Sequence, residues 1–65
     1  MVKTEDGIKL EAGERAFNYY GRKPGVIGDI ESDGWFDFNH DDGTKAFLNG
    51  ERICSVEFAK RKGWM

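Results

Sequence analysis

The chain has 65 residues, of which 38% are hydrophobic and 34% charged, and its formal net charge is −2. These values describe one small globular domain and exclude both a second domain and a disordered, highly charged tail. With one cysteine and one histidine, the chain alone can form neither an internal disulfide nor a structural zinc site, so its fold depends on an apolar core. The single thiol predicts a reducing, cytoplasmic location, and MVKTEDGIKL contains no apolar run that would predict a signal peptide or a membrane span.

The first half of the chain predicts short strands separated by turns. Residues 1–10 predict a hairpin around Asp6-Gly7 or a frayed arm. The stretch ERAFNYY, residues 14–20, favours a strand because it is rich in aromatic side chains. A loop follows, with Pro24-Gly25 suited to the centre of a type II turn. The stretch VIGDI, residues 26–30, then predicts a strand with Gly28 at a bulge.

The stretch WFDFN, residues 35–39, shows strict alternation of apolar and polar positions. Phe36 and Phe38 share one side of this expected strand, and we place them in the core. Trp35 and Asp37 share the other side, which we expect to be partly exposed because burial of Asp37 would require a partner.

Turn signals on both sides of this strand complete an antiparallel arrangement. Asp33-Gly34 predicts a two-residue hairpin turn before it, and a D-D-G turn leads into TKAFL, residues 44–48. Asn49-Gly50 predicts a type I′ hairpin turn into ERIC, residues 51–54. The expected sheet is therefore a meander of five strands.

The end of the chain predicts a short helix over residues 56–62. Ser55 suits its N-cap, Gly63 suits the position after its end, and the basic side chains of its last turn oppose the helix dipole. Val56 and Ala59 should face inward. Trp64 is expected to fold back onto the domain, with a free tail as the alternative.

An open sheet of five short strands would expose two edges, and curling into a partly open barrel removes most of that exposure. Residues 11–54 resemble the SH3-like barrels of the KOW and Tudor type. The KOW-like positions are Gly13, Arg15, Gly25, Val26 and Ile27, and the Tudor-like part is the aromatic strand and D-D-G-T turn between Trp35 and Thr44. This resemblance implies a five-stranded antiparallel SH3-like barrel. Together with the short C-terminal helix, we expect one mainly β domain over residues 1–65.

The stretch WFDFNHDDGT also admits chemical interpretations. It begins like a calcium loop, but its glycine comes one residue late and Leu48 occupies the position of the bidentate glutamate. His40 beside Asp41 and Asp42 could be half of a catalytic pair, although a solvated histidine at a hairpin tip needs no such role. Cys54 is interpreted as a buried structural thiol. We therefore predict no catalytic residue, no metal site and no cofactor.

The aromatic residues exceed what a core of this size needs. Phe17, Phe36, Phe38, Phe47 and one tyrosine would fill it. The remaining rings lead to a predicted partner-binding surface made of Trp35, Asp37, Tyr19 and Tyr20. Ring faces and carboxylates would there hold a cationic side chain or a Pro-rich segment, unless Trp35 simply lies flat over the sheet. Six acids and no Lys or Arg lie between residues 24 and 44, which favours a basic partner.

The predicted function is thus a non-enzymatic interaction module whose partner is a protein or peptide segment with basic or apolar anchors. The alternative is a KOW-like nucleic-acid-binding domain, in which Tyr19 or Tyr20 stacks on bases and basic residues contact phosphates (Arg22, Lys23, Lys60, Arg61 and Lys62). The pI near 5.3 argues against this alternative. No membrane partner is expected, and self-association through a strand edge is left open.

Overall fold

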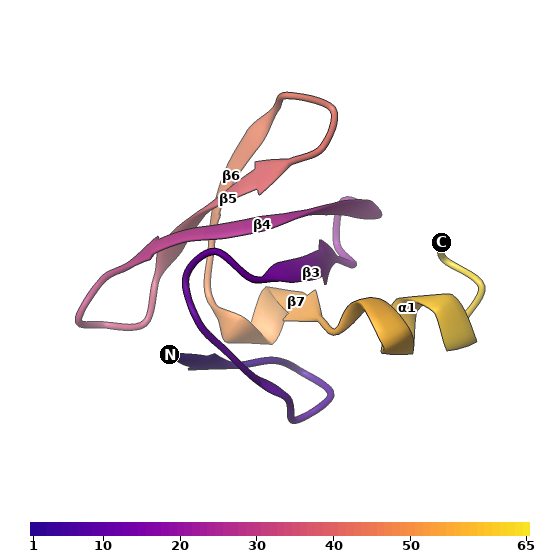
Figure 1. Cartoon of the computed structure of the whole chain (residues 1–65), viewed down its shortest axis with the longest axis horizontal. Coiled ribbons are helices and arrows are strands. Elements are labelled where there is room, and N and C mark those ends of the chain that lie inside the picture. The colour runs from indigo at the N-terminus through magenta and orange to yellow at the C-terminus, as the bar shows by residue number, and fades with distance from the viewer.

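The computed structural model describes all 65 residues and shows a curled five-stranded antiparallel sheet, a half-barrel, with one short C-terminal helix (Figure 1). The strand order is β6-β5-β4-β3-β7, and a separate two-stranded hairpin, β1-β2, precedes it in the chain. The elements are β1 Val2–Lys3, β2 Lys9–Leu10, β3 Arg15–Asn18, β4 Lys23–Ile30, β5 Phe36–His40, β6 Lys45–Leu48, the 3₁₀ helix η1 Gly50–Arg52, β7 Ile53–Cys54 and α1 Val56–Arg61. The mainly β class with a C-terminal helix is confirmed.

The core lies on the concave side of the sheet, as the alternation in β5 predicted. Phe36 and Phe38 are both fully buried. They belong to one apolar cluster with residues from six other positions (Val2, Leu10, Ala16, Ile27, Leu48 and Ile53). Burial of a Phe side chain contributes about 1.5–3 kcal/mol, so these two rings hold β5 to the rest of the half-barrel.

Helix α1 is confirmed, with its end one residue earlier than expected. The Ser55 hydroxyl accepts the Phe58 N–H at 3.2 Å, and Gly63 takes a positive φ of 76° after the helix. Ala59 is buried against Phe17 and Cys54 in a second small cluster, whereas Val56 is half-buried. Trp64 folds back as predicted, with its ring 6.1 Å from that of Phe17.

The Asp-Gly turns are three-residue loops, so the two-residue turn predicted at Asp33-Gly34 is wrong. Glu31 N–H donates to the Trp35 carbonyl and Gly34 N–H to the Glu31 carbonyl, at 2.8 and 2.9 Å. The same pair of bonds closes the loops that contain Gly7 and Gly43, and all three glycines have φ between 86° and 89°. This repeated type I turn followed by a left-handed residue sets the register of each hairpin.

The turn predicted at Pro24-Gly25 is also wrong, because both residues lie inside β4. A Cβ at position 25 would collide with the backbone carbonyl of Asn39 on β5, so Gly25 serves close strand packing instead of a turn. Pro24 stands opposite Asp41, just beyond the end of β5, and accepts the Asp41 N–H at 3.0 Å. Its missing N–H therefore costs only the return bond to the Asp41 carbonyl, at the very end of the β4–β5 ladder.

The type I′ hairpin predicted at Asn49-Gly50 is absent as well. The Asn49 side chain instead caps η1 by accepting the Glu51 N–H at 3.1 Å. This tight helix carries the chain away from β6, and β7 pairs with β3 at the other edge of the sheet. Gly50 is required because a Cβ there would collide with the Lys3 carbonyl. The meander consequently has four strands, and the fifth closes the half-barrel.

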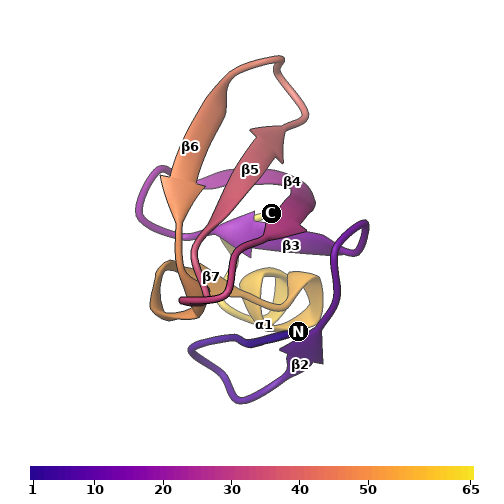
Figure 2. The same ribbon diagram turned by 90° about the vertical axis from the view of Figure 1, so that its left-hand side faces the viewer.

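The two edges of the sheet differ. Along β7, the Glu5 N–H donates to the Ile53 carbonyl at 2.9 Å, so the N-terminal hairpin covers this edge. In Figure 2 this hairpin lies below α1, and the β5–β6 hairpin extends from the opposite side of the molecule. Strand β6 is hydrogen-bonded to β5 alone. No helix is long and apolar enough to cross a membrane.

Candidate functional site

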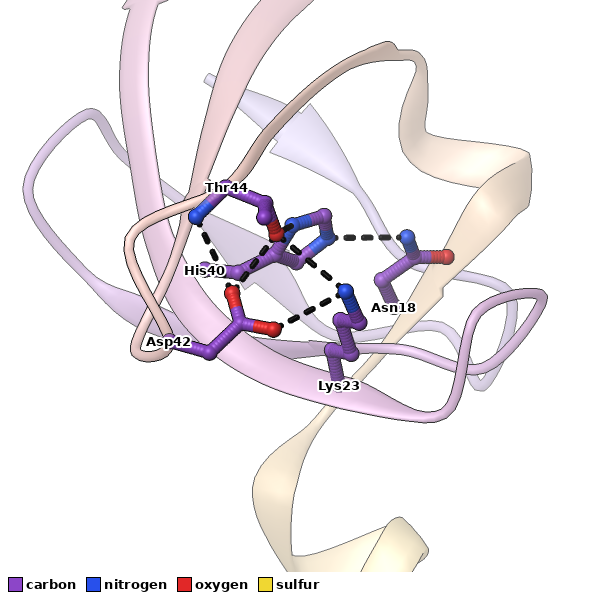
Figure 3. Close-up of polar contacts among 5 residues, drawn as sticks. All are labelled: Asn18, Lys23, His40, Asp42 and Thr44. Atoms are coloured by element: carbon purple, nitrogen blue, oxygen red, sulfur yellow. Dashed lines mark hydrogen bonds and ion pairs between the residues drawn. The ribbon is translucent and has the colours of Figure 1, made fainter.

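We expected the histidine of WFDFNHDDGT to be solvated at a hairpin tip, and this prediction is wrong. His40 is the last residue of β5 and is 9% exposed, because it continues the inward alternation of Phe36 and Phe38. Its Nε2 lies 3.1 Å from Asn18 Nδ2, and its Nδ1 lies 2.9 Å from Thr44 Oγ1 (Figure 3). Both ring nitrogens are therefore held by neighbouring strands.

The hydrogen bonds of Asn18 fix the tautomer of this ring. Its Oδ1 accepts the N–H groups of Tyr20 and Gly21, at 3.2 and 3.3 Å, so its amide NH₂ faces the imidazole. Nε2 of His40 must then accept, which leaves the proton on Nδ1. This proton is donated to the Thr44 hydroxyl.

The network continues to the surface through two charged groups. The Thr44 hydroxyl donates to Asp42 Oδ1 at 2.6 Å, and Lys23 Nζ lies 2.9 Å from Asp42 Oδ2. The bond from Thr44, followed by that from Lys23, holds the pKa of Asp42 well below its ordinary range. Figure 3 shows the side chains of β3, β4 and the β5–β6 hairpin converging here. The arrangement fixes the hairpin to its neighbours, and no group of three or more potential metal ligands is present.

The convex side of the β5–β6 hairpin carries an exposed aromatic pair, and here the prediction that Phe47 fills the core is wrong. The register places Ala46 opposite Phe38 and Phe47 opposite Asp37, so Phe47 points outward and is 53% exposed. Its ring stacks on Trp35 at 5.4 Å with an interplanar angle of 21°. We call Trp35, Asp37 and Phe47 the outer aromatic face.

Tyr19 and Tyr20 form a second aromatic group, apart from the outer aromatic face. The Tyr19 ring stacks on Trp64 at 6.0 Å, and Tyr20, 63% exposed, lies under the guanidinium of Arg52 at 4.6 Å. Strand β4, which spans roughly 25 Å, separates this group from Trp35. In Figure 1 the β3–β4 turn lies near the C-terminus and the β4–β5 loop at the opposite end. The structure thus brings Trp35 and Asp37 together, and Tyr19 and Tyr20 together, without joining the two pairs.

Two of the predicted basic residues, Arg22 and Lys62, lie beside this second group. Arg22 lies 4.4 Å above the Trp64 ring, and Lys62 lies 5.4 Å from the Phe58 ring. Lys60 and Arg61 are exposed on the last turn of α1. Lys23 is not part of this surface, because it joins the Asp42 network.

A hollow of about 310 Å³ opens between α1 and β7 beside these cations. It is lined by Glu5, Tyr19, Cys54, Phe58, Lys62 and Trp64. Burial, with a smaller contribution from the charge of Asp6, raises the pKa of Cys54 to about 11. The thiol is therefore protonated at neutral pH, and a nucleophilic role would require a thiolate.

Two important side chains were not identified from the sequence. Phe47 could have been placed outward from the D-D-G loop, because a three-residue loop between His40 and Thr44 fixes its pairing with Asp37. Asp6 gives no such local signal, because its partner Ser55 lies 49 residues away.

Comparison with known protein families, curated proteins and solved structures finds no match to this chain. The outer aromatic face and the second aromatic group are the two surfaces of the half-barrel on which exposed rings gather.

Proposed function

We propose that this protein is a non-enzymatic interaction module of the SH3-like, KOW/Tudor type, and that its outer aromatic face binds a protein segment with basic or apolar anchors. The observation that supports this most directly is the exposure of Phe47, stacked on the half-buried Trp35. Burying the exposed half of a Phe side chain is worth about 1 kcal/mol, and a stacked pair offers a rigid surface at little entropic cost.

The charges around this face favour a cationic anchor. Asp37 stands directly across from Phe47, and Asp33 lies two residues before Trp35. Neither carboxylate takes part in the three ion pairs of the structure, which involve Glu11, Asp41 and Asp42. A lysine or arginine from a partner would therefore meet ring faces and unneutralised carboxylates together.

A nucleic-acid function through the second group is the other candidate, and one observation favours it. Tyr20 is exposed beside Arg52, and Arg22 and the basic end of α1 lie around the neighbouring Trp64. Stacking on Tyr20 and phosphate contacts by these cations would give binding that weakens steeply between low and moderate salt. A fluorescent single-stranded oligonucleotide, titrated at two salt concentrations, tests this candidate.

The proposed function is tested by titrating ¹⁵N-labelled protein, at about 20 µM, with synthetic twelve-residue peptides that carry Lys or Arg next to Pro or Leu. Shifts should concentrate at Trp35, Asp37 and Phe47, and Phe47→Ala should weaken binding about tenfold. Tyr20→Ala is the matched control, because it removes an aromatic ring of similar exposure from the other group. Trp35→Ala should abolish peptide binding with the fold intact. Unfolding of that variant, or equal loss of binding in Tyr20→Ala, would contradict the assignment.

A further inference from the structure

The register of the β5–β6 hairpin shows which backbone N–H and C=O groups of β6 point outward without a hydrogen-bond partner. The His40 N–H donates to the Thr44 carbonyl at 2.9 Å, so these two residues form a hydrogen-bonded pair at the end of the hairpin. Because such pairs alternate along an antiparallel ladder, Ala46 and Leu48 bond to β5, and the N–H and C=O groups of Lys45 and Phe47 point away from it. No backbone or side-chain hydrogen bond outside the sheet satisfies them.

These unpaired groups belong to the one edge of the sheet that no other element covers. The N-terminal hairpin covers the edge at β7 through Glu5 and Asp6, which bond to Ile53 and Ser55. An uncovered edge is a template for a further strand, and the outer aromatic face lies directly beside this one.

We propose that the protein forms a symmetric dimer in which the β6 strands of two copies pair antiparallel across a twofold axis at Ala46. This inference rests on the proposed function, because it names a second copy of this chain as a partner of the outer aromatic face. In this register Lys45 of each copy stands opposite Phe47 of the other. Both residues have outward N–H and C=O groups, so the two strands exchange four backbone hydrogen bonds.

The side chains of β6 are self-complementary in the same register. Residues directly opposite each other share a face of the sheet, so Lys45 of one copy lies beside the Phe47 ring of the other, with Asp37 on the far side of that ring. The second copy thereby supplies the basic and the apolar anchor that the face favours. On the concave side the two small Ala46 side chains meet without a clash.

The arrangement also closes on itself. Each chain has one uncovered sheet edge, and in the dimer the uncovered edges of the two copies pair with each other. Pairing therefore stops at two copies and does not continue into a fibre. A strand of four residues gives an interface below the usual size of stable complexes, so we expect a dissociation constant on the order of 100 µM.

The test combines sedimentation velocity with amide hydrogen exchange, at about 20 µM and about 1 mM protein, on either side of that expected constant. The sedimentation coefficient should rise with concentration. The amides of Lys45 and Phe47 should exchange about fourfold more slowly in the concentrated protein, where roughly four fifths of the chains are dimeric, than in the dilute protein. Those of Ala46 and Leu48 should be protected in both. If the protection of all four amides is the same at both protein concentrations, the proposal is overturned.

Two variants identify the edge itself. Lys45→Pro removes an outward N–H and no bond to β5, and it should leave a folded monomer. Lys45→Glu should weaken the dimer about tenfold, because two cation–ring contacts are lost and two repulsions with Asp37 appear. The double variant Asp37→Lys with Lys45→Glu exchanges the charges and should restore most of the affinity. A dimer that persists in Lys45→Pro, or a double variant as weak as Lys45→Glu, would refute this interface.

Failure of the dimer and failure of the proposed function give different results. If the protein is a monomer at 1 mM but the peptides shift Phe47, the face binds other segments and the dimer inference is wrong. If the dimer forms as described but no peptide binds, the inference stands and the broader function as a peptide-binding module is wrong.

Discussion

Asp6 joins the two ends of the domain, and its removal is the perturbation whose effect the structure defines best. Its carboxylate accepts the Thr4 hydroxyl at 2.6 Å, the Ser55 N–H at 2.9 Å and the Ser55 hydroxyl at 2.6 Å. Ser55 is also the N-cap of α1, so the same carboxylate positions both the N-terminal hairpin and the start of the helix. Asp6→Ala leaves all of these donors without their acceptor.

The size of the effect follows from the type of bond. A hydrogen bond to a charged group contributes about 1.5–3 kcal/mol, and bonds that share one half-buried acceptor are not additive. We expect Asp6→Ala to lower the free energy of unfolding by about 2–3 kcal/mol. A domain of this size has a total stability of only about 3–10 kcal/mol, so this loss of unfolding free energy should be readily measurable.

Acid should reduce this difference between wild type and variant. Burial raises the pKa of Asp6, but the bonds donated by Ser55 and Thr4 outweigh it, so the pKa in the folded protein lies below its ordinary value of 3.8. The carboxylate therefore stabilises the fold fully above that ordinary value, and the contribution is lost as the pH falls through the lowered pKa. The difference in stability between wild type and Asp6→Ala should therefore be smaller in acid than at pH 7.

Urea denaturation, followed by tryptophan fluorescence at pH 7 and in acid, measures both effects. Asp29→Ala is a suitable control, because it removes an exposed carboxylate with no hydrogen bond or ion pair in the structure. A stability for Asp6→Ala within about 0.5 kcal/mol of wild type at pH 7 would refute the reasoning, since surface substitutions give changes of that size. A loss that stays the same in acid would refute the role of the ionised carboxylate.

Three further predictions concern other close contacts. Gly50→Ala should cost about 1–3 kcal/mol in urea denaturation, because its Cβ collides with the Lys3 carbonyl and the backbone has to shift. Thr44→Val removes the hydroxyl that accepts the His40 Nδ1 proton, so the ring ¹⁵N shifts should show a loss of that single tautomer, at a cost of about 1–2 kcal/mol. Cys54, buried and with a pKa raised to about 11, should react with a thiol reagent at pH 8 only as fast as the domain opens; fast reaction in the folded protein would contradict its burial.

Local signals in the sequence predicted the parts of the fold that depend on local physics. The alternation around Phe36 and Phe38 identified the buried side of β5, and Ser55 and Gly63 identified both ends of α1 within one residue. In each case the residues that carry the signal are themselves the cause of the structure.

Several of the errors arose where a residue serves a contact distant in sequence. Gly25 and Gly50 read as turn glycines, but each makes room for a backbone that arrives from another part of the chain. Packing also determines that β7 pairs with β3. The Asn49-Gly50 pair does not decide this locally, because Asn-Gly suits both a hairpin turn and a capped 3₁₀ helix. The outward position of Phe47 followed from loop length, which the D-D-G signal defined only to within one residue.

The joining of residues 2–6 to residues 50–55 has a consequence for synthesis of the chain. Within this domain the N-terminal hairpin leaves the ribosome before the other elements, yet the segment it packs against is among the last parts of the domain to emerge. Until then neither β1–β2 nor the β7 edge of the half-barrel has its partner, and closure of so long a loop slows folding. The nascent domain should therefore resist proteases only after almost all of its residues have been made.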